Sequence, residues 1–474
     1  MAAKLPPVRP NSTPDPAART VGGGPGPSEV GWLPDLVYAG GHFESGMAFF
    51  ADSLGRITRF SREPADLSSA RRLAGQAALP GLVNSHSHAF HRVVRGRRFD
   101  RGSPDPIQVA AARLDGGDVF DTARQVFMEM LLAGVTCVGE FHYLHHGPDG
   151  TAWPEPNLLG QEIVRAAREV GIRIALLQGA QFRSGCGAPT GTATPRCGFA
   201  DVDHFLGATE ALRTFVEANH PADEAWIGVA PYDFATVPLD ALKAIGTYAH
   251  ERRFRLHLHV SGPEIEGEAG AGEYGRKPLS SLAEHGLLDK RFTAVAAAGL
   301  SDDECALVGN ARATVCLCPP GDLGTGYGIS MWEAPAAAGV GIALGTDSHA
   351  RVNLLTEAWR IAGGRITGGT LSAAESSAAL FHAATVGGAR SLGTAGGALE
   401  VGRPADFFTV NLYDPALAGA DADSLLSNLL LAGERRPVRE VWIGARQRVA
   451  NGRHALHGPI IGRFVDVQRR LWRR

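Results

Sequence analysis

The 474-residue sequence has no marked excess of charge of either sign. Its 46 lysine and arginine residues stand against 49 aspartate and glutamate residues and give a formal net charge of −3. That balance excludes the strongly basic surface on which nucleic-acid binding depends. The sequence also lacks an apolar run of the ~20 residues that cross a bilayer. Its first residues show no basic segment followed by an apolar run, which would mark a secretory signal. We therefore expect a cytoplasmic protein with neither nucleic-acid nor membrane partners.

Cysteine is also sparse, and its spacing lacks the CxxC pairs that indicate many metal or redox sites. The six cysteines are Cys137, Cys186, Cys197, Cys305, Cys316 and Cys318. A chain of this length can bury a sufficient core without disulfides, so we predict free thiols. Cys316 and Cys318 stand two residues apart on an expected strand and share one face. Because cysteine is among the most buried residue types, we predict that this pair packs in the core rather than binding a metal.

Composition and patterning divide the chain into several parts. Residues 1–29 are rich in proline, glycine, serine and threonine and predict a flexible tail. Short apolar segments separated by turns occupy residues 30–79 and return in 386–456, and we expect these two pieces to pair into one small β-sandwich domain. Residues 80–385 lie between them. Residues 457–474 form a basic amphipathic C-terminal extension, for which we expect a solvated helix or a dimer contact.

The central part alternates apolar strand candidates with segments of helical periodicity. FDTARQVFMEMLLAG and NLLGQEIVRAAREVG repeat apolar residues every three or four positions and end in glycine. The expected strands are residues 78–88, 136–143, 173–181, 225–233, 255–260, 292–299, 314–319 and 342–348. Eight strand–helix units predict an α/β fold, namely a (β/α)8 TIM-type barrel. In such barrels the chemistry takes place at the C-terminal ends of the strands.

Polar residues end three of these strands. His86-Ser87-His88 ends the first strand, and because alternate residues share a face, both imidazoles can reach one ion. Strand five ends at His259 and strand eight at Asp347. Three histidines and one carboxylate suit a single zinc- or iron-class ion, and the fourth strand carries no lysine that could bridge a second ion. The alternative is a set of hydrogen-bonded core or rim histidines, which would have to match three strand ends by chance.

Three further histidines, His142, His145 and His146, follow the second strand. Because they lie at or beyond the strand end, we expect them to support the metal ligands or to line the rim rather than to bind the ion. A metal bound at the neighbouring strand ends would lower the pKa of a water molecule toward ~7, so that hydroxide becomes available at neutral pH.

Longer motifs surround these residues and carry a resemblance. They are PGLVNSHSHAFHRVVRGR, AGVTCVGEFHYLHHGPDG, ATVCLCP, GTDSHA and VREVWIGARQRVANGRH. With them the chain resembles formimidoylglutamate deiminase of the amidohydrolase superfamily over most of its length. The resemblance implies a mononuclear metal, attack of hydroxide on an amidine carbon, release of ammonia and a homodimer. It also implies that His91 and Tyr143 lie in the substrate pocket. The metal ligands that it implies are His86, His88, His259 and Asp347.

The sequence departs from that family's pattern around the implied site. Gly262 stands where the family has a glutamate, and residues 296–299 replace a segment with two histidines. On strand four, residues 232–235 replace His-Ser-x-Arg, while the segment 101–114 is shorter and lacks another expected arginine. Residues 319–322 replace a Thr-Thr-Glu segment. The acid–base groups and the arginines that would hold a glutamate-like substrate are therefore missing, whereas the four ligands are kept.

Three functions fit this pattern. The first is a metal-dependent enzyme with a changed substrate or reaction, which could be hydrolysis, elimination or cyclisation. Its catalytic groups would be Asp347, Asp233 and His91. Its substrate-binding side chains would be His91, Tyr143 and Tyr232. The second function is ordinary N-formimidoyl-glutamate deiminase, and the third is a catalytically inactive homologue that binds a ligand or a partner protein. We expect the first, with a small-molecule substrate, one zinc or alternatively iron ion, and a homodimeric assembly.

Overall fold

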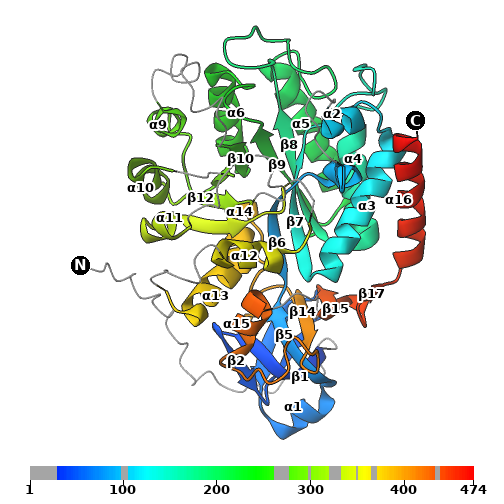
Figure 1. Cartoon of the computed structure of the whole chain (residues 1–474), viewed down its shortest axis with the longest axis vertical. Helices are drawn as coiled ribbons and strands as arrows, with labels where there is room; N and C mark the ends of the chain where they lie inside the picture. The colour runs from blue at the N-terminus through cyan, green and yellow to red at the C-terminus, as the bar shows by residue number, and fades with distance from the viewer. Residues whose placement is uncertain are drawn as a thin grey trace.

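The computed structural model divides the chain between two β-sheets. An eight-stranded parallel sheet forms a barrel, and a nine-stranded mixed sheet lies at its lower end in Figure 1. The residues that the structure describes are 29–97, 105–260, 277–296, 300–319, 332–347, 351–363, 371–432 and 438–473. Sequence predictions that fall on residues 1–28, 101–104, 262, 297–299 and 320–322 lie outside these ranges.

All eight predicted barrel strands are present. They are β6 (Leu82–Ser87), β7 (Val135–His142), β8 (Arg173–Ala180), β9 (Ala225–Pro231), β10 (Leu256–His259), β11 (Phe292–Val295), β12 (Thr314–Leu317) and β13 (Gly341–Leu344). Each pairs in parallel with its neighbours in chain order. The last strand returns to the first, because the backbone N–H groups of Thr346 and Asp347 donate to His86 O at 2.9 and 3.2 Å. The C-terminal ends of the strands therefore meet at one rim.

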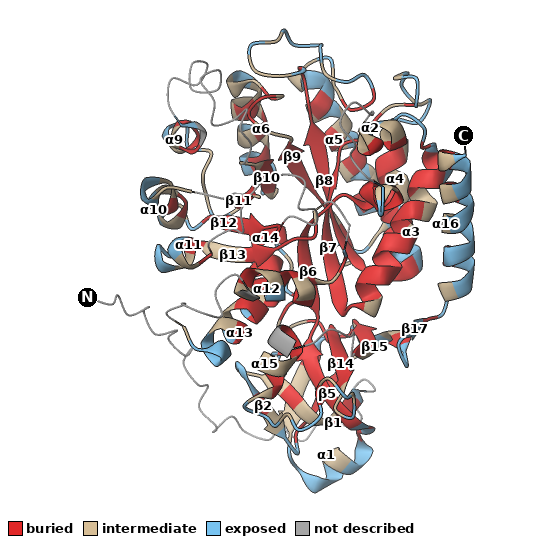
Figure 2. Cartoon of the chain, in the orientation of Figure 1, coloured by how far each residue is buried: buried red, intermediate tan, exposed pale blue. Residues whose placement is uncertain are grey.

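The barrel strands are largely buried on both faces, because side chains fill the inside and helices cover the outside. Every residue of β7 and β8 is buried, and these strands are red in Figure 2. On the outside, α4 (Leu158–Val170) buries Leu159, Ile163 and Ala167, which recur every four residues along one face. The helix ends at Gly171, whose φ of 85° is a left-handed conformation that glycine adopts without strain.

Helices surround the barrel in Figure 1. Those that the structure describes are α1 (Pro64–Ser69), η1 (Ala89–Val94), α2 (Pro106–Ala111), α3 (Gly116–Leu132), α4, α5 (Val202–Asn219), α6 (Leu239–Arg252), α9 (Pro278–Glu284), α10 (Asp302–Asn310), α11 (Glu333–Ala337), α12 (Leu354–Gly363), α13 (Ala373–His382), η2 (Ala383–Gly387), α14 (Gly388–Leu392), α15 (Leu425–Ser427), η3 (Asn428–Ala432) and α16 (His457–Trp472). None of them is long and apolar enough to span a lipid bilayer.

The mixed sheet joins the two ends of the chain. Its strands are β1 (Val30–Ala39), β2 (His42–Ser45), β3 (Ala48–Ala51), β4 (Ile57–Ser61), β5 (Arg71–Pro80), β14 (Phe407–Asn411), β15 (Val438–Ile443), β16 (Arg446–Ala450) and β17 (Arg453–His454). Strand β5 lies between the two groups, parallel to β1 and antiparallel to β14. An aromatic core fills this part, with the Trp32 ring centroid 5.3 Å from that of Phe49 and 5.2 Å from that of Phe407. The predicted fold class, a barrel with a small β domain from both chain ends, is confirmed.

The first predicted barrel strand, residues 78–88, is in fact two strands that belong to different sheets. Residues 78–80 end β5 in the mixed sheet, and β6 begins at Leu82 in the barrel. Gly81 makes the turn between them, and its N–H donates to Asp406 O at 2.9 Å. A Cβ at Gly81 would lie 2.2 Å from Thr136 Oγ1, so only glycine fits there. Apolar residues on both sides of Gly81 made the two strands look like one in the sequence.

The predicted domain limit at residue 386 falls inside η2, which packs on the barrel. A Cβ at Gly387 would lie 1.9 Å from Ile342 O, and one at Gly388 would lie 2.5 Å from Val83 O. These backbones approach that closely because both positions lack a side chain. The domain limits stay a prediction, and these contacts favour a limit after α14.

The predicted C-terminal extension forms α16, which lies along α3 at the right of Figure 1. It buries Ile460, Val467 and Leu471, while its outer face is exposed (Figure 2). Two of its side chains also reach η1, because Gln468 Nε2 and Trp472 Nε1 both donate to Val93 O, at 2.9 and 3.1 Å. The apolar face of this helix is therefore used within the chain.

Candidate metal centre

The first pair of predicted ligands stands at the end of β6. His86 and His88 occupy alternate positions, so their rings point into the same space, and their Nε2 atoms are 3.1 Å apart. Both side chains are buried, at 0% and 2% exposure. The two imidazoles therefore present their lone pairs to one point inside the barrel rim.

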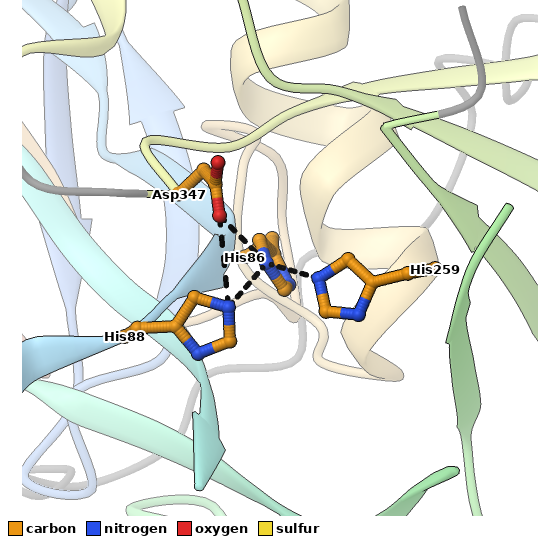
Figure 3. Close-up of side chains that lie close together, drawn as sticks. All are labelled: His86, His88, His259 and Asp347. Atoms are coloured by element: carbon orange, nitrogen blue, oxygen red, sulfur yellow. Dashed lines mark hydrogen bonds and ion pairs between the residues drawn. The ribbon is translucent and has the colours of Figure 1, made fainter. Parts of the chain in front are cut away.

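The other two predicted ligands arrive from distant strands. His259 ends β10, and its Nε2 lies 3.2 Å from that of His86. Asp347 follows β13 with a φ of 45°, and its Oδ1 lies 3.5 Å from His86 Nε2 and 3.6 Å from His88 Nε2. One ligand atom from each of the four residues falls within 4.8 Å of the others (Figure 3). The structure thus brings together all four residues that the sequence singled out.

The hydrogen bonds of the rings fit a cation at the centre. His88 Nδ1 lies 2.9 Å from Phe141 O, and His259 Nδ1 lies 2.8 Å from Tyr232 O. Because a carbonyl can only accept, each Nδ1 carries the proton and each Nε2 directs a lone pair inward. Lone pairs this close repel unless a positive ion lies between them. In tetrahedral zinc sites, Zn–N bonds place neighbouring nitrogens about 3.3 Å apart, close to the spacings found here.

Burial keeps these imidazoles neutral. It lowers the pKa of His259 to about 4, with a further contribution from the neighbouring His86, and it lowers the pKa of His88 well below its usual range. Burial alone would raise the pKa of Asp347, but its hydrogen bond and electrostatic interaction with His86, followed by those with His88 and His259, hold it well below the usual range. Neutral imidazoles at His88 and His259 and an ionised carboxylate at Asp347 are protonation states that metal binding needs.

Glu140 is a buried carboxylate that the sequence reasoning did not single out. It lies in β7, and its Oε2 accepts a hydrogen bond from Ser87 Oγ at 2.6 Å while its Oε1 accepts one from Ala89 N at 2.6 Å. Burial raises its pKa to about 8. Its two contacts flank His88 and hold the strand end that carries the ligands. A charged residue within an otherwise apolar strand was the signal that could have found it.

Aromatic and histidine rings form a wall beside the four ligands. His91 lies in η1, and its Nε2 is 2.7 Å from Tyr143 OH. The ring centroid of His91 is 4.7 Å from that of His88, and the centroid of Tyr232 is 5.1 Å from that of His259 and 5.2 Å from that of Tyr143. The predicted substrate-binding residues therefore lie next to the predicted ligands.

Asp233, predicted as a catalytic group, lies just after β9 and takes part in a turn. Its Oδ1 accepts hydrogen bonds from Thr236 N and Thr236 Oγ1, both at 2.7 Å. Asp233 does not belong to the four-residue group within the described ranges. These contacts give the carboxylate a structural use, and its catalytic role stays a prediction.

The histidines after the second strand contact backbone rather than the ligand group. His145 Nε2 lies 2.9 Å from Gly179 O, and His146 Nε2 lies 3.0 Å from Gly198 O. His142 is buried at the end of β7. None of the three belongs to the four-residue group found in the described chain.

Position 296 and the two neighbouring cysteines form a small apolar cluster. Ala296 follows β11 with a φ of 52°, and its N–H donates to Cys316 O at 3.0 Å. Cys316 and Cys318 are buried, and their Sγ atoms are 3.8 Å apart. All six cysteines of the chain are free thiols. The predictions of free thiols and of core packing for Cys316 and Cys318 are confirmed.

Residues 77–448 match the model of the amidohydrolase family. The chain belongs to the amidohydrolase family. Formimidoylglutamate deiminase of Pseudomonas aeruginosa is 31% identical over 421 residues, which cover 86% of this chain and 92% of that protein. The predicted resemblance and the predicted enzyme class are confirmed by these matches.

Solved structures of amidohydrolases have the same fold. An amidohydrolase from Brucella melitensis superposes with a TM-score of 0.83 at 25% identity and covers 94% of this chain and 100% of that one. An adenosine deaminase from Xanthomonas campestris with bound zinc superposes with a TM-score of 0.79 at 23% identity and covers 94% and 99% of the two chains. Both match almost the whole length of the described fold.

Proposed function

We propose that this amidohydrolase uses one zinc ion, held by His86, His88, His259 and Asp347, to hydrolyse a C–N bond in a small substrate that lacks the two carboxylates of a glutamate. The observation that carries the proposal is the convergence of the four ligand atoms within 4.8 Å at the barrel rim. A bound zinc ion in the Xanthomonas campestris adenosine deaminase supports the choice of metal. Iron is the alternative that the same donor set would accept.

The residues around the ion have distinct roles in this proposal. An ion bound here supplies Lewis acidity and lowers the pKa of a water molecule toward ~7. Asp347 turns Oδ1 toward His86 and His88, and its second oxygen accepts the proton of the attacking water. His91 and Tyr143, hydrogen-bonded at 2.7 Å, form one side of the substrate pocket. Burial raises the pKa of Tyr143 well above its usual range, so its hydroxyl stays protonated and can donate to the substrate.

The pocket wall favours a flat substrate of low charge. Phe141, Tyr143 and Tyr232 present rings beside the ligands, with the Tyr143 and Tyr232 centroids 5.2 Å apart. Ala235 stands where the resemblance leads us to expect an arginine, and it is buried. Residue 235 itself offers no cation to a substrate carboxylate, and the nearby Arg183 guanidinium is held by Ala235 O at 2.7 Å and Phe234 O at 3.3 Å, so a carboxylate that loses its hydration among these rings would be poorly compensated. We therefore infer an amidine or an amino-substituted heterocycle as the substrate class.

Formimidoylglutamate deiminase activity is the second candidate. The identity of 31% over 92% of the Pseudomonas aeruginosa enzyme favours it. In that case other side chains of this chain would replace the glutamate, histidine and arginines that the family pattern contains. The homodimer and the absence of nucleic-acid partners stay predictions.

The test is metal content and ammonia release measured on one preparation. Elemental analysis of the purified chain should give about one zinc per chain, and His86→Ala should lose it, because it removes the imidazole nearest the other three ligands. His42→Gln is the matched control, since His42 is an exposed histidine of the mixed sheet whose contact is Glu44. Ammonia release is then compared between N-formimidoyl-glutamate and a panel of uncharged amidines and aminoheterocycles.

The outcomes separate the candidates. Zinc with ammonia released from an uncharged substrate supports the proposal. Rapid release from N-formimidoyl-glutamate would establish the second candidate instead. A chain that takes up no metal and releases no ammonia from any compound would contradict both and leave the inactive binding homologue.

A further inference from the structure

A second cavity of about 460 Å³ lies at the opposite end of the barrel from the metal centre. The N-terminal starts of β8 and β9 border it on the barrel side, through Arg173 and Ala225. The mixed sheet borders it through the turn around Arg56 and the turn that joins β15 to β16. The eight residues of β8 separate the two ends of the barrel by roughly 23 Å. The cavity is therefore a separate site, located between the two sheets.

Arginine dominates the charged lining of this cavity. The lining arginines are Arg56, Arg168, Arg173, Arg446 and Arg448. Only two carboxylates line it, Asp223 and Glu224. The lining of the cavity therefore carries more positive than negative charge, in a chain whose formal net charge is −3. A concentration of like charge around a hollow raises the local concentration of anions.

The nearby carboxylates are already engaged by two of the arginines. Arg173 Nε and Nη2 bind Asp406 at 2.7 and 3.1 Å, and Arg173 Nη1 binds Asp223 at 3.1 Å. Asp406 also accepts from the N–H of Gly444 at 2.7 Å. Arg446 Nη1 lies 4.0 Å from Glu224. These contacts leave the other arginines without a carboxylate of their own in the described part of the chain.

Arg448 is the arginine of this cavity whose side chain most directly lacks an acceptor within the described ranges. Its Nε is buried and has no hydrogen-bond partner in the described ranges. The guanidinium lies against Gly171, where a Cβ would come within 2.7 Å of its Cζ and Nε. Burial and repulsion from Arg446 lower the pKa of Arg448, and the opposing attraction of Glu224 and Asp406 is too weak to restore it. A buried donor without a partner is destabilising, so an acceptor at this place would be stabilising.

Arg168 and Arg56 complete the set from both sides of the cavity. Arg168 lies in the last turn of α4 on the barrel side, and within the described ranges its Nη1 contacts the backbone oxygen of Asn219 at 3.4 Å. Arg56 belongs to the mixed sheet, and among the residues that the structure describes its Nη1 contacts Gly402 O at 3.4 Å. Both contacts are long and made to uncharged acceptors. Their guanidinium groups are available to an incoming anion.

We propose that this cavity binds a small polyanion carrying phosphate groups, held by Arg448, Arg168 and Arg56. Planar guanidinium groups match phosphate oxygens in pairs, which a single lysine cannot do. The volume lies in the range of small-molecule sites, roughly 300–1,000 Å³. Because Arg168 comes from helix α4 of the barrel and Arg56 and Arg448 come from the mixed-sheet part, the bound anion would connect the two and stabilise the fold.

Titration calorimetry of the full chain with inorganic pyrophosphate at constant ionic strength tests the proposal. We expect saturable binding near one pyrophosphate per chain and a higher melting temperature in its presence. Arg448→Gln and Arg168→Gln should each weaken binding at least tenfold. Arg165→Gln is the matched control, because Arg165 lies on the same helix but outside the cavity and contacts Glu162 and Phe120. Its binding should equal that of the parent chain.

A further variant separates this site from the metal centre. A bound metal ion could itself hold pyrophosphate, so the titration is repeated with His86→Ala. The proposal requires that this variant bind pyrophosphate as the parent does, whatever its metal content. Loss of binding in His86→Ala, or equal binding in Arg448→Gln and the parent, would overturn it. Citrate binding more tightly than pyrophosphate would overturn the assignment to phosphate.

Discussion

Ser87 Oγ donates a 2.6 Å hydrogen bond to Glu140 Oε2, and this contact joins the strand that carries two candidate ligands to the neighbouring strand of the barrel. The other oxygen of Glu140 accepts from Ala89 N, so one carboxylate holds the backbone on both sides of His88. The residue has no place in the four-residue group, yet it determines where a ligand ring points. Residues that orient metal ligands without binding the ion themselves affect the metal affinity.

Glu140→Gln should therefore weaken zinc binding by about 10- to 100-fold. Glutamine keeps the size of the side chain, but it has only one accepting oxygen. Its NH2 group donates and cannot replace the oxygen that accepts from Ser87 or from Ala89. Competition with a chromophoric chelator measures the affinity. Ser87→Ala is the milder comparison, because it removes one of the two hydrogen bonds and should have a smaller effect. Zinc affinity unchanged in Glu140→Gln would show that β6 holds its end without this contact.

The ligand set could be predicted from sequence, whereas this supporting contact could not. His86 and His88 share a strand face by spacing alone, and a barrel gathers strand ends at one rim whatever the loops do. Glu140 acquires its role only through the register of β6 against β7, in which Ser87 pairs with Glu140. Register depends on contacts between strands that are distant in sequence.

Two other features show where patterns in the sequence stop being informative. Residues 78–83 are apolar on both sides of a Pro80-Gly81 pair, and that pair alone does not tell a break within one strand from a change of sheet, which is set by contacts of Gly81 with Thr136 and Asp406. Asp233 stands at a strand end, where catalytic groups of barrels lie. A carboxylate three residues before a threonine can equally accept hydrogen bonds from that threonine and so stabilise a turn, as Asp233 does with Thr236. Only the folded chain distinguishes these uses.

Gly81→Ala should destabilise the fold by about 1–3 kcal/mol. The new methyl group would lie 2.2 Å from Thr136 Oγ1, and the backbone at the junction of the two sheets would have to move. Urea unfolding of the metal-free chain measures the change. Gly117→Ala serves as the control, because Gly117 is exposed near the start of α3 and its nearest contact would be Asp115 Oδ1 at 3.4 Å. That variant should be neutral or slightly stabilising. Equal stability of the two variants would contradict the tight junction.

Stability should fall in acid partly through His142. Burial lowers the pKa of this imidazole to about 3, with repulsion from Arg196 as a smaller cause. The unfolded chain takes up the proton near the ordinary pKa of about 6.5, so the unfolded state binds more protons between these two values. The stability that the neutral His142 allows is therefore fully present above pH 6.5. It is lost as the pH falls toward 3, by up to about 1.4 kcal/mol of unfolding free energy per pH unit.

The unfolding free energy of His142→Gln should therefore decline less steeply between pH 6.5 and pH 5 than that of the parent. The two slopes should differ by up to about 1.4 kcal/mol per pH unit, the value for one proton. Urea denaturation of the metal-free chain at several pH values gives that slope. His204→Gln should keep the parent slope, because His204 is an exposed residue of α5. If His142→Gln and the parent decline in parallel, His142 takes up its proton in the folded chain as easily as in the unfolded one.

Restoring two family residues should not by itself restore formimidoylglutamate deiminase activity. Ala296 has a φ of 52°, a conformation that histidine tolerates better than most residues, so Ala296→His combined with Gly262→Glu should fold and keep the metal. Ala235 would still offer no cation to the substrate carboxylates, and charge-assisted hydrogen bonds of this kind contribute about 1.5–3 kcal/mol each. Ammonia release from N-formimidoyl-glutamate should therefore stay at least ~100-fold below that of the Pseudomonas aeruginosa enzyme assayed alongside. Release approaching that enzyme's rate would show that proton transfer alone had been lost and that the substrate site of the deiminase is still present.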